Sequence, residues 1–268
     1  MMLKISLVAV VFVFLQAASA QEFALLVRNC RDKHLSRLNE CLVSAIKRIQ
    51  PQLGDGIPSL NIPPMEPLLL DDILFRQAEG PVNIEARYRK VMVTGASMFD
   101  LKYFDWFAEE KKMFLGMTFP MMIMTGQYNL TGNVFQLPVE GNGDFVVMLD
   151  GIVAQSVGEI SVAADGSTRL SNMKLNFDIM KMKSKLMNLF NGNQVLSETL
   201  HHFLNSNSQV VLDEVRPEIS RQLSGFVTNL LQALISSLPN EVLSTIENSN
   251  TQDKHRQRTL QVRAGNTV

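Results

Sequence analysis

Apolar residues recur every three or four positions in two parts of the chain, which is the spacing of one face of an α-helix. The first run begins at Leu35 and stops before Pro51, and Ser36 near its start suits a helix N-cap. The second run spans residues 208–238, about 30 residues and roughly 45 Å of helix. Pro217 lies near the start of that run, where it either kinks the helix or marks its first turn. We therefore predict a short N-terminal helix and a long C-terminal helix.

The long helix has a broad apolar stripe. The members of the stripe are Val211, Val215, Ile219, Leu223, Phe226, Leu230, Leu234 and Leu238, and Val227, Leu231 and Ile235 widen it. A helix of this length with so wide an apolar face needs a large curved surface around it. The residues that we expect to be buried are Leu223, Phe226, Leu230 and Leu234.

Between the helices, residues 70–185 alternate polar and apolar side chains, most clearly at 174–179 and in part at 144–149. This period of two is typical of strands, and short turns rich in Gly, Asn and Asp separate the runs. We predict several long strands in one antiparallel sheet. The run 113–124 is apolar on both faces, so it must be covered on both sides or line an apolar cavity. Upstream, four prolines and two glycines within residues 54–67 exclude a helix and predict an ordered, extended crossing segment.

The first 20 residues have the features of a secretory signal peptide, which would not be part of the fold. Lys4 supplies a positive start, residues 5–15 are apolar, and residues 18–20 form an Ala-x-Ala cleavage site. Their removal takes one lysine from a chain of 268 residues with net charge −1, so 248 residues with net charge −2 remain. A chain of this charge has no electrostatic footprint for nucleic acid, and no later stretch reaches the length of a membrane-spanning helix. Residues 248–268 are polar with a basic cluster and are predicted to form a disordered tail.

The two cysteines, Cys30 and Cys41, predict one disulfide in an oxidising extracellular compartment. Two free thiols or a redox pair are the alternative, but the C-x-x-C spacing of a redox pair is missing. On one straight helix the two positions would be roughly 16 Å apart, beyond the roughly 7 Å reach between bridged Cα atoms. Cys30 is therefore expected on a non-helical arm that doubles back along the helix carrying Cys41.

The chain shows no motif for a cofactor, a metal or a catalytic nucleophile. The pair Gly141 and Gly143 is a hairpin turn, because Val146 stands where a dinucleotide fingerprint has its third glycine. The segment 95–99 begins Gly-x-Ser but ends in Phe, so it is no nucleophile elbow. His201 and His202 are adjacent and point about 100° apart on a helix, so they do not share a metal. We therefore expect a protein that is not an enzyme and that uses neither cofactor nor metal.

Methionine is abundant, and most of it lies in two clusters. The clustered residues are Met113, Met117, Met121, Met122, Met124, Met173, Met180, Met182 and Met187. Flexible, polarisable methionine suits unselective apolar ligands, although filling of the core explains any single methionine equally well. Asn129-Leu130-Thr131 is an N-glycosylation acceptor, so Asn129 should face solvent. Strand alternation then points Tyr128 inward, where its hydroxyl bonds either a backbone carbonyl or a polar group of a ligand.

Four segments, in this order, resemble the insect takeout and juvenile-hormone-binding proteins of the tubular lipid-binding superfamily, over about residues 29–243. The segments are Cys30 with Leu38-Asn39-Glu40-Cys41-Leu42, residues 53–63 followed by Glu66-Pro67-Leu68, residues 126–143, and the long C-terminal helix. Glu66 stands where the family usually has Asp. The second cysteine pair of the hormone-binding members is missing, which favours a takeout-like protein over a carrier of juvenile hormone itself.

The resemblance implies an α+β fold in which a highly curved antiparallel sheet wraps the long helix, as a single domain at residues 21–247. It implies a secreted carrier in haemolymph or another extracellular fluid, with a link to circadian, feeding or hormone signalling. The ligand would be a juvenile hormone-like terpenoid, a fatty acid or a similar lipid in an apolar tunnel. The candidate tunnel residues are Tyr128, Met122, Met124, Val147, Phe177, Phe226 and Leu230. Two alternatives remain: a hydrolase of esters in the tunnel, hinted at by the two adjacent histidines, and a membrane-surface lipid binder that uses the basic tail.

Overall fold

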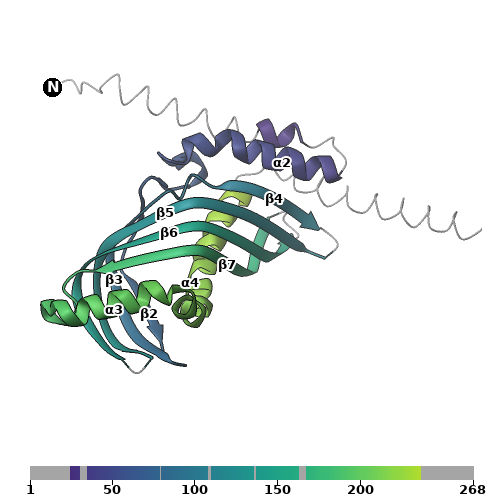
Figure 1. Ribbon diagram of the computed structural model, residues 1–268. Helices are drawn as coiled ribbons and strands as arrows, with labels where there is room; N and C mark the ends of the chain where they lie inside the picture. Colours follow the sequence, from purple (N-terminus) through teal and green to yellow (C-terminus); the bar gives the residue numbers. More distant parts are fainter. Residues whose placement is uncertain are drawn as a thin grey trace, which may run out of the picture.

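The computed structural model describes residues 25–30, 35–78, 80–107, 110–135, 137–162 and 167–236. The expected signal peptide and the expected polar tail at 248–268 lie outside these residues. Figure 1 shows a long arched sheet with α2 above one end and α3 at the opposite end. In the described part of the chain, no helix combines the length and the apolar character that a membrane crossing requires.

The described residues build one antiparallel sheet of seven strands. The strands are β1 (Leu68–Leu70), β2 (Ile73–Gln77), β3 (Val82–Thr94), β4 (Asp100–Phe107), β5 (Lys112–Val134), β6 (Leu137–Val162) and β7 (Thr168–Leu186). The main path runs β1-β3-β5-β6-β7, while β2 pairs with β3 and β4 pairs with β5. With 23 residues, β5 is long enough for β3 and β4 to pair with different halves of it. The predicted sheet of long antiparallel strands is confirmed. The hairpin turn predicted at Gly141 and Gly143 is wrong, because both residues lie inside β6 and pair with β5.

The strands arch because irregular residues interrupt their pairing. The pairing of β3 with β5 shifts between Arg89 and Met92, and that of β6 with β7 shifts between Val157 and Glu159. An extra residue on one strand of a pair bends that strand and increases its twist. The sheet therefore has a concave inner face, on which the helices pack, and a convex outer face.

Two consecutive helices, α3 (Gln194–Ser206) and α4 (Ser208–Ser236), follow the sheet. The side chain of Asn193 caps α3 by accepting a hydrogen bond from the amide of Leu196 at 3.2 Å. The predicted long C-terminal helix is confirmed as α4, which has 29 residues and continues through Pro217. In Figure 1, α4 passes behind β5, β6 and β7.

The apolar stripe of α4 is less buried than its sequence predicts. Leu223 is 38% exposed, so the expectation that it is buried is wrong, and Phe226, Leu230 and Leu234 are only half-buried. The sheet covers one side of the helix, while the widened stripe extends further around it. Part of the stripe therefore stays in contact with solvent or with space inside the protein.

Polar side chains of α4 hold it against β7, an edge strand of the sheet. The guanidinium of Arg216 donates to the carbonyl of Phe177 at 3.0 Å and also pairs with Asp178. The amide N–H of Leu170 donates to the side-chain oxygen of Gln232 at 2.7 Å. These bonds satisfy backbone groups that an edge strand would otherwise leave unpaired.

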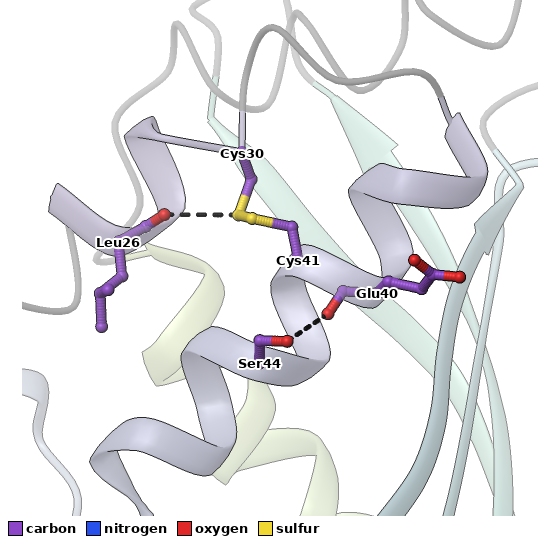
Figure 2. The surroundings of a disulfide bond; sticks show 5 residues. All are labelled: Leu26, Cys30, Glu40, Cys41 and Ser44. Atoms are coloured by element: carbon purple, nitrogen blue, oxygen red, sulfur yellow. Dashed lines mark hydrogen bonds between the residues drawn. A yellow bond between two sulfur atoms is a disulfide. The ribbon is translucent and has the colours of Figure 1, made fainter.

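The N-terminal helix α2 (Leu35–Ile49) ends before Pro51 as predicted and packs on β4, but Ser36, the expected N-cap, lies within the helix. Cys30 and Cys41 form the expected disulfide, with their Cα atoms 5.6 Å apart. Figure 2 shows Cys30 off the axis of α2, which the spacing of the two cysteines requires. The arm is not wholly non-helical, however: residues 25–28 form a helical turn just before Cys30. The chain turns between the two cysteines, so one short helical turn on the arm is compatible with the bridge.

The segment rich in proline and glycine crosses from α2 to the sheet and contains two short 3-10 helices, Gln50–Gln52 and Pro58–Leu60. The prediction that residues 54–67 are wholly extended is therefore wrong, because proline is tolerated in the first turn of a helix. At its end, Glu66 precedes a cis peptide bond to Pro67. The carboxylate of Glu66 accepts hydrogen bonds from the amides of Gly95 and Ser97 and from the hydroxyl of Ser97, each at 2.9 Å. Burial alone raises the pKa of Glu66, but these three hydrogen bonds outweigh it and hold that pKa below its ordinary value. Glu66 thus anchors the crossing segment to the turn that follows β3.

Candidate ligand-binding interior

The inner face of β5 is apolar along its whole length but is unevenly buried. Met113 near one end and Tyr128 toward the other are buried. Between them, the inward-facing Phe119, Met122 and Met124 are only half-buried, although they pack in apolar clusters together with residues of α4. Inward-facing side chains keep accessible surface only where their neighbours leave space beside them.

The same pattern is found on β6 and on α4. On β6, Phe145 and Ile152 are buried, whereas Val147 and Leu149 between them are half-buried. The buried residues of α4 are Leu212 and Ile235, near its two ends. The half-buried apolar residues of α4 that pack toward the sheet between them are Val215, Ile219, Phe226, Leu230, Leu231 and Leu234. The middle of the interior is therefore less completely filled by side chains than its ends.

All seven predicted tunnel residues lie on the inner side of the sheet, six of them in its middle. Tyr128, Met122, Met124, Val147 and Phe226 belong to one apolar cluster formed by β3, β5, β6, α3 and α4. The neighbouring cluster contains Phe177, and Met122 contacts both clusters. Leu230 packs on a third cluster, beneath α2. The structure thus brings the first six together and places Leu230 toward the α2 end.

Tyr128 points inward, as strand alternation predicts, and is 4% exposed. Of the two partners expected for its hydroxyl, the structure shows a backbone carbonyl, that of Met187, which accepts the hydrogen bond at 2.7 Å. Burial, together with the nearby Tyr88, raises the pKa of Tyr128 to about 12. The hydroxyl therefore keeps its proton at neutral pH and donates it in the hydrogen bond to the carbonyl of Met187.

Sequence reasoning missed Tyr88, which lies directly opposite Tyr128 on β3. Its ring packs edge-on against Phe145 with 5.3 Å between centroids, and burial raises the pKa of its hydroxyl. Unlike Tyr128, Tyr88 has no hydrogen-bond partner among the described residues, and it is half-buried on the inner face. The alternation of polar and apolar residues in 82–89 carries the signal that places it inward.

The two adjacent histidines have different environments. The Nε2 atom of His201 accepts a hydrogen bond from the amide of Leu186 at 2.9 Å, so that nitrogen carries no proton. Burial lowers the pKa of His201, and the neighbouring Lys185 lowers it further. His201 therefore joins α3 to the end of β7 as a neutral ring. Within the described ranges, no three His, Cys, Asp or Glu side chains lie close enough to hold a metal ion.

Asn129 is exposed on the outer face of β5, as expected for a glycan acceptor. It lines an open hollow of about 580 Å³ between β2, β3, β5 and β6. The side chains around the hollow are mainly polar and include Arg87, Arg89, Gln127 and Asp144. A polar, open hollow does not suit an apolar ligand, so the inner face is the candidate site.

Comparison with known proteins agrees with this architecture. The profile of the family described as haemolymph juvenile hormone binding protein (JHBP) matches residues 8–244. The crystal structure of Takeout 1 from Epiphyas postvittana superposes with a TM-score of 0.65 at 23% identity, covering 75% of this chain and 93% of that one. Lipopolysaccharide binding protein reaches a TM-score of only 0.35 at 13% identity, covering 73% of this chain and 39% of that one. No curated protein matches the chain in sequence. Because the family profile spans most of its length, the chain belongs to the haemolymph juvenile hormone binding protein family.

Proposed function

We propose that this protein is a secreted carrier that holds a small, elongated hydrophobic ligand between the inner face of the sheet and α4. The observation that carries the proposal is the accessible apolar surface of inward-facing residues in the middle of the interior, such as Met122, Met124 and Val147. Burial of apolar ligand surface stabilises a complex by roughly 25 cal/mol per Å². The flexible side chains of methionine adapt to ligands of different shape. Carriage requires no catalytic group.

The ligand class that fits is an apolar chain with one polar group, such as a terpenoid ester, an epoxide or a fatty acid. The hydroxyl of Tyr88 supports this choice, because a tyrosine hydroxyl in a mostly apolar environment usually has a hydrogen-bond partner. The name of the family agrees with a terpenoid ligand. The proposed lining consists of Met122, Met124, Val147, Phe177, Phe226 and Leu230. Tyr128 holds this lining in place through its hydrogen bond to the carbonyl of Met187.

Secretion is part of the proposal. It is supported by the apolar N-terminal segment with its cleavage site and by the disulfide between Cys30 and Cys41. Glycosylation at Asn129 belongs to the same proposal, since the acceptor triplet is exposed. A role in circadian, feeding or hormone signalling would follow from the identity of the ligand.

A pair of neighbouring valines allows a matched test. Val147 faces inward and is opposite Met124, whereas Val146 faces outward on the same strand. Val147→Trp adds bulk to the interior and should weaken displacement of a fluorescent fatty acid at least tenfold, while Val146→Trp should leave it unchanged. Met124→Phe adds less volume and replaces Val147→Trp if the latter does not fold.

Native mass spectrometry of the secreted protein completes the test by identifying the molecule that co-purifies. The proposal predicts a lipid-sized adduct in the wild type, which is lost or reduced in the Val147→Trp variant. Equal binding by both tryptophan variants would contradict an inner-face site. Absence of any adduct together with absence of displacement would contradict the carrier function.

A further inference from the structure

The outer face of the sheet carries exposed apolar side chains at its centre, next to a row of lysines. We call this surface the Met–Lys face. It consists of Met92, Met121, Ile123, Val146, Met148, Lys181, Lys183 and Lys185.

Strand pairing places these residues on one surface. Ile123 on β5 is opposite Met148 on β6, which in turn is opposite Lys183 on β7. In the adjacent row, Val146 is opposite Lys185. Directly paired residues of neighbouring strands point to the same side of a sheet, so the apolar residues and the lysines share the face turned away from α4.

The apolar part of this surface is accessible. Met121 is 45% exposed, Met92 is 44% exposed and Met148 is 37% exposed. Single exposed apolar residues are ordinary on protein surfaces, but a contiguous group on one sheet face marks an interaction site. The surface therefore calls for a partner that accepts unbranched apolar side chains.

The lysines beside the apolar residues indicate that the partner is negatively charged. Lys181, Lys183 and Lys185 are all exposed, and none has an ion-pair partner in the described part of the chain. The acidic residues of the same surface are Asp150, opposite Lys181, and at the margins Asp144 and Asp178, of which Asp178 is paired with Arg216. Positive charge prevails in the row along β7, so a partner with negative charge is favoured.

We propose that the Met–Lys face docks the protein on an anionic lipid bilayer. Methionine side chains enter the boundary between head groups and acyl chains, while lysines bind lipid phosphates and carboxylates at the surface. A second copy of this chain fits less well, because two such faces would bring like-charged lysine rows together. Docking would put a carrier in contact with the phase in which a hydrophobic ligand dissolves.

Vesicle co-sedimentation of the full chain tests this, with phosphatidylcholine alone and with phosphatidylcholine mixed with phosphatidylserine. Lys181→Gln combined with Lys183→Gln should weaken binding to the anionic vesicles about thirtyfold, the loss expected for two surface lysines. Lys111→Gln combined with Lys174→Gln removes the same charge from exposed positions outside the face and should leave binding unchanged. Binding should also fall with salt and be absent on phosphatidylcholine alone.

Two further variants separate the methionines of the face from the basic C-terminal segment. Met121→Ser combined with Met148→Ser should weaken vesicle binding while the lysines remain. The variant Lys254→Gln, Arg256→Gln and Arg258→Gln tests the C-terminal segment in the full chain and should bind as the wild type does.

Several outcomes would overturn the proposal: no binding to anionic vesicles, equal losses in the two lysine pairs, or a loss confined to the C-terminal variant. A dimer in sedimentation that the serine variant dissociates, without vesicle binding, would assign the face to a second copy instead. Vesicle binding is measured without any internal ligand, and fatty-acid displacement is measured without vesicles. The docking face and the proposed carrier function can therefore fail separately.

Discussion

Two neighbouring tyrosines offer a sharp test of the interior, because their hydroxyls have different partners. Tyr88 and Tyr128 are directly opposite each other on β3 and β5. The hydroxyl of Tyr128 donates to the carbonyl of Met187 at 2.7 Å, whereas the hydroxyl of Tyr88 has no partner among the described residues. Substitution of either residue by Phe removes one oxygen and leaves the ring in place.

The expected magnitudes follow from these partners. Tyr128→Phe removes a hydrogen bond and leaves the Met187 carbonyl unpaired, so the free energy of unfolding should fall by about 1–2 kcal/mol. Tyr88→Phe removes a hydroxyl that no protein group satisfies, so stability should stay the same or rise slightly. If that hydroxyl binds the polar group of the ligand, affinity should fall by about 1 kcal/mol, which is roughly fivefold.

The assay combines chemical denaturation with displacement of a fluorescent fatty acid. Each variant is tested against a long-chain methyl ester and a hydrocarbon of equal length. Tyr88→Phe should lose its preference for the ester, while Tyr128→Phe should keep that preference and lose stability. A Tyr88→Phe protein with unchanged selectivity would refute the assignment of Tyr88 to the ligand. A loss of selectivity in Tyr128→Phe alone would return that role to Tyr128.

Three further changes test contacts that hold the fold together. Glu66→Gln should lower stability by about 2 kcal/mol at neutral pH, because the hydrogen bonds to Gly95 and Ser97 lose their charge and solvent screens part of the effect. Since the pKa of Glu66 is lowered in the folded protein, the wild type should lose this advantage as pH falls below the ordinary value of 4.5. Urea denaturation should therefore show that the free energies of unfolding of the two proteins differ at neutral pH and approach each other at acid pH. Cys41→Ser should cost about 3 kcal/mol and reduce secretion, and equal alkylation of both thiols in the native secreted protein would disprove the bridge. Arg216→Met should lower the melting temperature by loosening α4 from β7, and a variant with wild-type stability would show that this contact is energetically neutral.

Local pattern was sufficient for most of the secondary structure. The period-two alternation predicted the strands, and the stripe of apolar residues predicted α2 and α4, because each period reflects the geometry of one element by itself. The inward direction of Tyr128 and the outward direction of Asn129 followed from the same alternation. The two cysteines predicted the disulfide, since their spacing requires only that the chain turn between them.

Contacts between distant segments could not be read in this way. Glu66 accepts hydrogen bonds from a turn 29–31 residues away, and no local pattern encodes that pairing. The exposure of Leu223 depends on how far the sheet wraps around α4, which is a property of both elements together. The missing partner of Tyr88 is likewise a property of the whole interior.

The run 113–124 shows most clearly what each level determines. By itself the sequence predicted that the run is a strand with neighbouring residues on opposite sides, but both sides are apolar and neither is marked as inner. The pairing with β6 is also interrupted at Pro120, so Phe119 and Met122 both face inward. Packing of α4 and pairing with β6 decided that Met122 and Met124 face the interior while Met121 and Ile123 face solvent beside the lysines of β7. Alternation fixes only the relative direction of neighbouring side chains, and the face that is buried depends on which side the rest of the chain covers.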